Sequence, residues 1–186
     1  TQNRRMESLE QRIGYQFANR QLLEEALTHP SLAYETKRSR SDNQRLEYLG
    51  DAVIQLIFTD ELYELFPRSS EGKLTKLRSR LVSRDALCRF AKQIELGKEL
   101  FLGKGEEISG GRERPSNLAD AMEALAGAIY LDGGLSPART FILSNFGAAI
   151  EEIAAEPDEN NPKGSLQEKL QSMNASSPSY QIVSQE

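Results

Sequence analysis

The chain has 186 residues and a formal net charge of −5, with 38% hydrophobic and 27% charged residues. These values suit a domain of ordinary size with a short extension, and they provide enough apolar residues for a core. No apolar run approaches the roughly 18 residues of a membrane-spanning helix, and the first residues lack the apolar stretch of a secretory signal. We therefore expect a protein with no membrane partner.

The first predicted elements are two short helices. A helix around Leu9 stops at Gly14, and Asn19 is suited to cap a second helix that ends before Pro30. Residues 34–42 are polar and basic and have no apolar period, so they predict a loop.

A long helix is predicted over residues 43–65, and Pro67 stops it. Its apolar residues recur at helical spacing and leave little polar face, so this helix should be central to the fold. The residues that carry the period are Leu46, Leu49, Val53, Ile54, Leu56, Ile57, Leu62 and Leu65.

The next two predicted helices carry much of the positive charge. Ser70 is suited to cap the first, and Ser83 to begin the second, which runs to about Leu96 with Gly97 beyond its end. Residues 73–92 contain seven cations and one anion. They form either solvated helix faces or a phosphate-binding surface, and the negative net charge argues only weakly against the second.

Residues 101–115 are rich in glycine and charge and predict a mobile loop beside a site. Their Gly-Lys-Gly sequence lacks the preceding strand and the following Ser or Thr of a phosphate-binding loop, which argues against that interpretation. A helix is predicted from Pro115 through Tyr130. After an Asp-Gly-Gly turn, another helix begins near Ser136 and runs to about residue 155.

The remaining residues predict a change of organisation. Residues 156–161 are acidic, contain a proline and predict a linker. A capped helix and a possible strand over 180–183 follow, but they are too short to form a core of their own. We expect an all-α domain over residues 1–155. Residues 162–186 are then a docking extension or the first part of another domain.

Two pairs of carboxylates stand out in the predicted helices. Glu47 and Asp51 are four residues apart and Asp120 and Glu123 are three apart, so each pair emerges from one helix face. Apolar residues flank all four, and a buried carboxylate without a counter-charge is costly. A shared Mg²⁺, or Mn²⁺ in its place, suits such oxygen ligands.

Three single residues limit the types of site that the sequence can form. The only histidine, His29, excludes zinc sites built from His and Cys clusters, and a role in ending a helix is favoured over catalysis. The only cysteine, Cys88, is predicted to be a core thiol and fits a reducing compartment. Gly50 permits a close approach to its helix, either by a ligand or by a packed helix.

Residues 43–53, NQRLEYLGDAV, resemble the signature of the ribonuclease III family, the Mg²⁺-dependent endonucleases of double-stranded RNA. The resemblance covers about residues 6–155, and the residues after Asn161 resemble the start of the family's double-stranded-RNA-binding domain, which is therefore expected to be truncated. The other matching segments, in the family's order, are ALTHPS, GKGEE, SGGRERPS and LADAMEALAGAIYLDGG.

The resemblance implies an all-helical nuclease domain that works as a homodimer in the cytoplasm. It also implies cleavage of double-stranded RNA to 5′-phosphate and 3′-hydroxyl ends with a two-nucleotide 3′ overhang, in rRNA and mRNA processing. By motif, the resemblance makes all four carboxylates metal ligands, with Asp51 and Glu123 the most critical for catalysis. The other roles it implies are a dimer contact at Tyr48, a supporting acid at Glu71 and RNA binding by Gln167 and Glu168.

One departure from the family pattern leaves an alternative open. Gln44 stands where the family commonly has Glu, and an amide cannot neutralise a metal. The alternative is therefore a non-catalytic relative that binds RNA. A helical nucleoside-triphosphate pyrophosphohydrolase also uses paired carboxylates on Mg²⁺, but that interpretation leaves the basic residues 73–92 unexplained.

Overall fold

The computed structural model describes residues 2–36 and 41–155. Within these ranges the chain is helical and contains no strand, apart from an isolated bridge between Thr28 and Phe101, so the predicted all-α class is confirmed. The predicted linker and the residues after it lie outside the described part. No helix in the described ranges combines the length and the apolar character needed to cross a membrane.

The first three helices are α1 (Gln2–Ile13), α2 (Arg20–Leu27) and α3 (Pro30–Thr36). Asn19 caps α2 as predicted, and its side chain accepts a hydrogen bond from the backbone N–H of Gln21 at 3.1 Å. Helix α3 differs from the prediction, in which Pro30 stops a helix and residues 34–36 belong to a loop. A proline is also suited to the first turn of a helix, where its missing N–H costs nothing.

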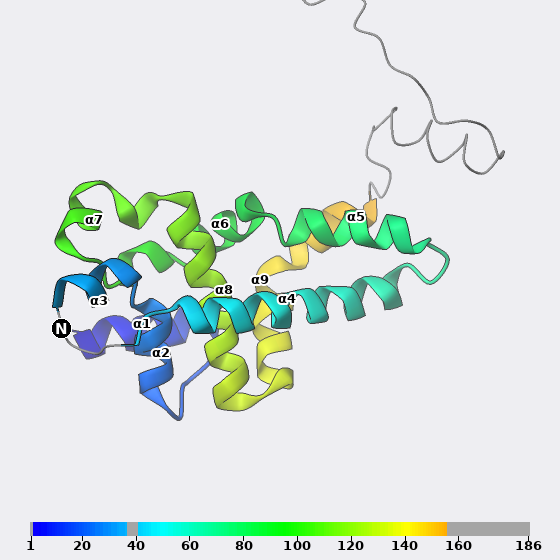
Figure 1. Cartoon of the computed structure of the whole chain (residues 1–186). Helices are drawn as coiled ribbons and strands as arrows, with labels where there is room; N and C mark the ends of the chain where they lie inside the picture. Colours follow the sequence, from blue (N-terminus) through cyan, green and yellow to red (C-terminus); the bar gives the residue numbers. More distant parts are fainter. Residues whose placement is uncertain (1, 37–40, 156–186) are drawn as a thin grey trace, which may run out of the picture. The chain divides into compact units, whose positions relative to one another are not determined.

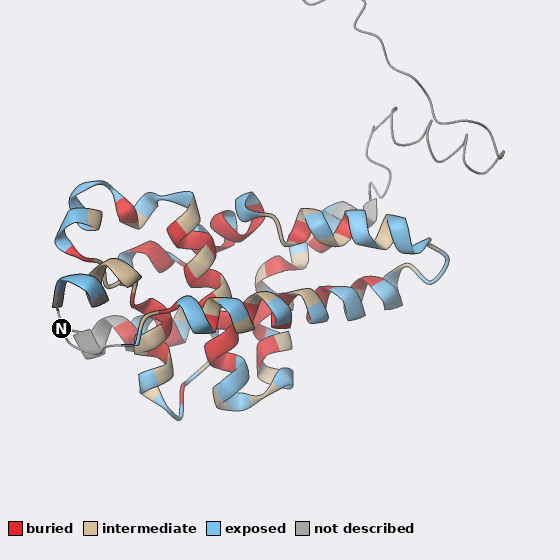
Figure 2. Ribbon diagram, in the orientation of Figure 1, coloured by how far each residue is buried: buried red, intermediate tan, exposed pale blue. Residues whose placement is uncertain are grey.

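Two long helices, α4 (Gln44–Leu65) and α8 (Pro115–Gly133), form the centre of the described unit (Figure 1). Both have a buried side facing the other, as Figure 2 shows, and the prediction of a central helix over residues 43–65 is confirmed. Helix α8 runs three residues beyond the predicted Tyr130 and is followed by Gly134, whose φ of 86° favours glycine.

Helices α5 (Glu71–Leu81) and α6 (Arg84–Gln93) follow α4. The side chains of Ser70 and Ser83 cap them as predicted. Helix α6 ends earlier than expected, because Glu95 adopts a left-handed φ of 53° and a short 3₁₀ helix, η1 (Leu96–Glu99), begins there. Gly97 lies inside η1, where it is buried. It does not follow the end of α6 as predicted.

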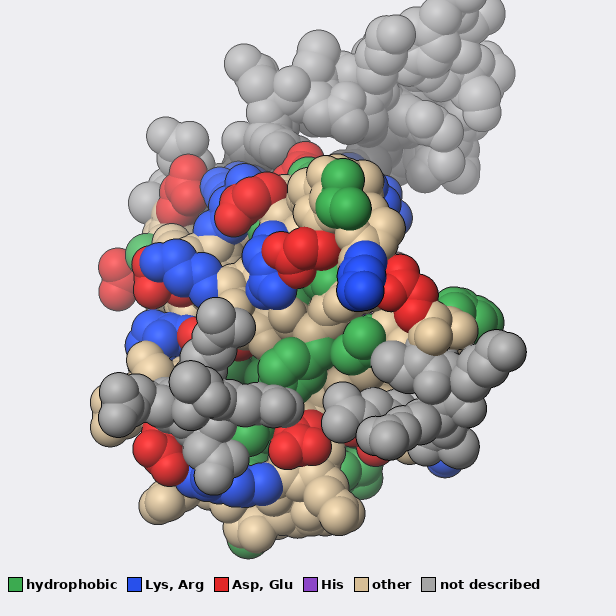
Figure 3. Space-filling model, turned by 90° about the vertical axis from the view of Figure 1, so that its left-hand side faces the viewer, with side chains coloured by type: hydrophobic (Ala, Val, Ile, Leu, Met, Phe, Trp, Pro, Cys, Tyr) green, Lys and Arg blue, Asp and Glu red, His purple; other side chains and the backbone are tan. Residues whose placement is uncertain are grey.

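The glycine-rich residues predicted to form a mobile loop are folded into α7 (Lys104–Ile108) and η2 (Gly111–Glu113). Arg112 holds them in place: its guanidinium donates to the carbonyls of Gly97 and Leu100, both at 2.9 Å, and pairs with Glu107 at 2.6 Å. Figure 3, which views the side of the molecule that carries α3 and α7, shows acidic and basic side chains next to one another.

The last described helix is α9 (Leu135–Ala155), which begins one residue before the predicted Ser136. Its Phe146 packs in the core against Phe58 of α4, with ring centroids 5.0 Å apart. Arg139 of α9 pairs with Glu61 of α4 at 2.7 Å. Cys88 is buried in the same core, as predicted for a structural thiol.

Candidate metal centre

Helices α4 and α8 cross with their backbones in direct contact. A Cβ atom built on Gly50 would lie 1.7 Å from the carbonyl oxygen of Glu123, and one built on Gly127 would lie 2.4 Å from that of Leu46. Real Cβ atoms do not come so close to another backbone, so only glycine fits at either position. Of the two interpretations of Gly50, the packed helix is therefore the one that the structure supports.

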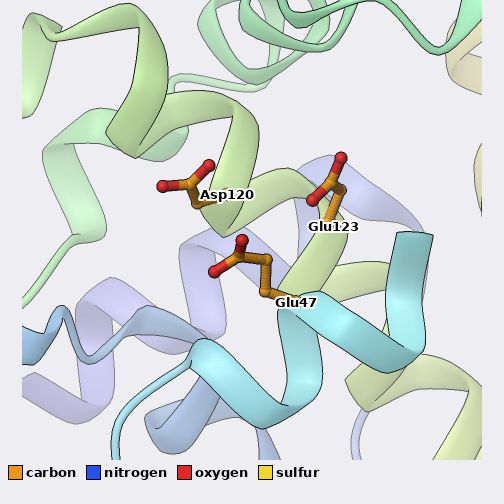
Figure 4. A group of neighbouring side chains, drawn as sticks. All are labelled: Glu47, Asp120 and Glu123. Carbon is orange, nitrogen blue, oxygen red and sulfur yellow. The ribbon is translucent and has the colours of Figure 1, made fainter.

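This close crossing brings three of the four predicted carboxylates together. Glu47 of α4 and Asp120 and Glu123 of α8 each offer an oxygen within 4.8 Å of the others, and all three are half-buried. Figure 4 shows Glu47 projecting from α4 towards the two acids of α8. In the described part of the chain, none of the three side chains has a hydrogen bond or an ion pair.

Burial raises the pKa of each of these acids, and neighbouring carboxylates add to the rise for Glu47 and Glu123. Burial raises the pKa of Glu123 most, to about 8, and the charges of Asp51, Glu47 and Asp120 add to the effect. Burial also raises the pKa of Glu47, with contributions from Asp120, Asp42 and Asp51. The protein therefore holds a group of anions that a cation would stabilise.

The donor atoms indicate the type of cation. The group consists of carboxylate oxygens alone, because Cys88 is buried elsewhere and His29 is not a member. Hard divalent ions such as Mg²⁺ and Mn²⁺ prefer oxygen ligands, whereas zinc and copper sites usually include nitrogen or sulfur. The residues present thus fit the type of ion expected from the sequence.

The fourth predicted ligand, Asp51, is not part of the group of three. Its two carboxylate oxygens accept hydrogen bonds from Nε2 of Gln55, one turn further along α4, both at 2.8 Å. Asp51 still lies near the centre, since its charge contributes to raising the pKa of both Glu47 and Glu123. Helical spacing predicts that Asp51 shares a face of α4 with Glu47, but it does not identify Gln55 as the partner of Asp51.

Two basic residues beside the centre were not recognised as part of it. Burial raises the pKa of Asp120, while Arg84 and His29 lower it. Arg84 begins α6 and is exposed, and among the described residues it has no hydrogen bond or ion pair. The Nδ1 atom of His29 lies 3.2 Å from the backbone N–H of Ser31, which donates to it.

The remaining predicted site residues do not belong to the group of three carboxylates. Tyr48 is 83% exposed, which excludes core packing within the chain as the reason for an aromatic residue there. Gln44 is exposed at the start of α4, and its backbone N–H donates to Asp42 at 3.2 Å. Glu71 is exposed at the start of α5 and accepts from Thr75 at 3.2 Å. The predicted RNA-binding residues lie outside the described ranges: Gln167 and Glu168.

Comparison with known proteins identifies the family. A sequence model described as Ribonuclease-III-like matches residues 19–150. Ribonuclease 3 of Caldanaerobacter subterraneus subsp. tengcongensis is 48% identical over 175 residues, which is 94% of this chain and 77% of that protein.

Solved structures agree with this result. The nuclease domain of ribonuclease III from Campylobacter jejuni is 39% identical, with a TM-score of 0.71 over 77% of this chain and 94% of that one. A second structure of that domain, described for flexibility in the region involved in dimer formation, is 40% identical, with a TM-score of 0.70 over 76% and 99%. The chain therefore belongs to the ribonuclease III family and is an endonuclease of that family.

Proposed function

We propose that this enzyme cleaves double-stranded RNA with the help of Mg²⁺, for which Mn²⁺ can substitute. The observation that carries the proposal is the half-buried group of Glu47, Asp120 and Glu123, whose oxygens lie within 4.8 Å of one another and form no ion pair with the described residues. Family resemblance supports the products: 5′-phosphate and 3′-hydroxyl ends with a two-nucleotide 3′ overhang. It also supports a role in rRNA and mRNA processing in the cytoplasm.

In this proposal the acidic side chains hold the metal, and Asp51 joins them as a fourth ligand. A bound divalent ion lowers the pKa of a water and neutralises charge on the phosphate as the 3′ oxygen departs. Burial and the neighbouring acids raise the pKa of Glu123 to about 8, so this carboxyl group would have to give up its proton to hold a metal. The pyrophosphohydrolase alternative is set aside, because the family match assigns the chain to the ribonucleases.

The RNA would lie along the basic surface beside the centre. Arg84 is exposed next to Asp120 and Glu123 and is suited to contact a phosphate there. Glu71 would stand at the rim of the same surface. Beyond residue 155 and a linker over 156–161, residues 162–186 would form the first part of a double-stranded-RNA-binding domain, with Gln167 and Glu168 on its first helix.

Two copies of the chain would form the working enzyme. Helix α4 exposes Tyr48, Leu56 and Tyr63 by 83%, 54% and 70%, and a second copy is the partner that the family resemblance implies. We expect Tyr48→Ala to weaken dimerisation in sedimentation experiments at low protein concentration. Tyr34→Ala is the matched control, because Tyr34 is 81% exposed on α3. A Tyr48→Ala variant that dimerises as tightly as the control would contradict this contact.

The direct test is cleavage of a perfect RNA duplex by the full-length protein at millimolar Mg²⁺. We expect products with two-nucleotide 3′ overhangs, and we expect no turnover of free nucleoside triphosphates. A protein that binds the duplex but never nicks it would instead support the non-catalytic alternative raised by Gln44. In that case Gln44→Glu should restore cleavage if the amide is the cause.

A further inference from the structure

Gln55 is the direct partner of one predicted metal ligand. Its Nε2 atom lies 2.8 Å from both carboxylate oxygens of Asp51, and the two residues are one helical turn apart on α4. An amide oxygen in this place would face two anionic oxygens, so the nitrogen must be the atom that points at Asp51. The amide nitrogen therefore donates to both oxygens of this one carboxylate.

This contact separates Asp51 from the other acids. Glu47, Asp120 and Glu123 share one small volume and have no donor, whereas Asp51 is turned towards a donor on its own helix. The neutral amide stabilises the Asp51 anion without adding a positive charge, which would compete with a metal for the same oxygens. Gln55 therefore fixes where the fourth carboxylate stands before any ion arrives.

We infer that Gln55 is a positioning residue for the metal centre, and this inference rests on the proposed function. Because the amide nitrogen holds both oxygens of Asp51, it sets the rotamer in which this carboxylate would be offered to a metal. A hydrogen-bond partner of a ligating carboxylate typically contributes roughly 10–100-fold to metal affinity. The position is half-buried, and Gln55 has no other side-chain hydrogen bond among the residues that the structure describes.

The test measures Mn²⁺ binding to the full chain. Electron paramagnetic resonance detects the free ion, so the measurement requires no turnover. We expect Gln55→Met, which keeps the length of the side chain but has no donor, to weaken binding about 10-fold. Gln11→Met, at an exposed position of α1, is the matched control and should bind as the wild type does. Gln55→Leu provides a second donor-free variant, and thermal melting checks that each variant is folded.

A double-mutant cycle makes the test specific. If Gln55 acts through Asp51, Gln55→Met should weaken Mn²⁺ binding no further once Asp51→Asn is present. Unchanged or tighter binding by both folded Gln55 variants would overturn the inference while leaving the metal centre intact. An equal loss in the Asp51→Asn background would overturn it as well. A wild-type chain that binds no Mn²⁺ would overturn the proposed centre itself.

Discussion

Two sets of carboxylates in this molecule are treated in opposite ways. Asp132, near the end of α8, accepts hydrogen bonds from Tyr15, Ala18 and Asn19 at 2.8–2.9 Å. Glu99 is 6% exposed, and its Oε1 pairs with Arg12 at 2.6 Å. The three acids between α4 and α8 receive no such donor from the described part of the chain.

The pKa values follow this difference. Although burial opposes it, hydrogen bonds from Asn19, Tyr15 and Ala18 hold the pKa of Asp132 below its usual value, whereas burial and neighbouring anions raise that of Glu123 to about 8. The fold supplies three donors to Asp132 and one to Glu99, whose Oε2 is buried without a partner among the described residues. The three acids between α4 and α8 receive no donor within the described ranges, and we call them unbalanced because their charge is available to a ligand. A lack of hydrogen-bond donors therefore indicates a functional site better than the number of acidic residues does.

The largest effect expected from this contrast is on cleavage. Glu123→Gln keeps the shape of the side chain but removes a ligand charge, so we expect cleavage of an RNA duplex to fall about 10³-fold, or about 4 kcal/mol of transition-state stabilisation. Duplex binding, measured by gel shift, should survive. Loss of binding together with cleavage would show that Glu123 is needed for the fold and would remove it from the unbalanced set.

The second prediction concerns the crossing that brings the acids together. Gly50→Ala would place a Cβ 1.7 Å from the Glu123 carbonyl oxygen, so α4 and α8 must separate. We expect a loss of about 3 kcal/mol or more in the free energy of unfolding, measured by urea denaturation. Gly72→Ala is the control, since nothing lies within 4 Å of its added Cβ and it should be neutral or stabilising. Equal stability of the two variants would contradict the close contact.

The third prediction concerns a carboxylate that has its donors. Its removal should lower stability and leave cleavage unchanged. Asp132→Ala leaves three donors without their acceptor, and we expect a loss of about 2 kcal/mol in stability, seen as a lower Tm, with cleavage per folded molecule unchanged. Glu113→Ala removes an exposed carboxylate and should leave Tm unchanged. An Asp132→Ala variant with normal Tm and impaired cleavage would contradict the distinction between carboxylates that have donors and the three unbalanced acids.

The smallest expected effect is on how the thermal stability of the protein depends on pH. Because the pKa of Glu123 is raised from 4.5 to about 8 in the fold, its contribution to stability is complete below pH 4.5 and is lost as pH rises through 8. At pH 9 without metal, Glu123→Gln should therefore melt about 2–4 °C higher than the wild type, or about 1 kcal/mol after screening by solvent. At pH 4 the two should melt alike. A gain that is independent of pH would exclude charge as its cause.

Apolar period and capping residues predict most of this fold. Asn19, Ser70 and Ser83 begin their helices as expected, because a side-chain cap is a local interaction that the sequence displays directly. The folded glycine-rich residues were not predictable in the same way. They depend on Arg112, whose carbonyl partners lie in η1 and at Leu100 just after it, 12–15 residues earlier. Spacing along the chain does not reveal such a contact.

The candidate site likewise has parts that the sequence predicts and parts that it does not. Helical spacing placed Glu47, Asp120 and Glu123 on faces that meet, and the structure brings them together. Spacing could not predict that Asp51 would turn to Gln55, because the rotamer of a carboxylate depends on competition between nearby donors. Nor could spacing place Arg84 and His29 beside Asp120, since they come from separate parts of the chain.

The contact between Gly50 and Gly127 has a consequence for how the enzyme tolerates change. Backbone atoms have no rotamers, so the separation of α4 and α8 at the centre does not depend on how neighbouring side chains are packed. Substitutions in the surrounding core can alter the stability of the whole protein while the spacing of the acids stays fixed. Core residues around the centre can therefore be substituted, for example during adaptation to heat or cold, without changing the distances between the acidic side chains.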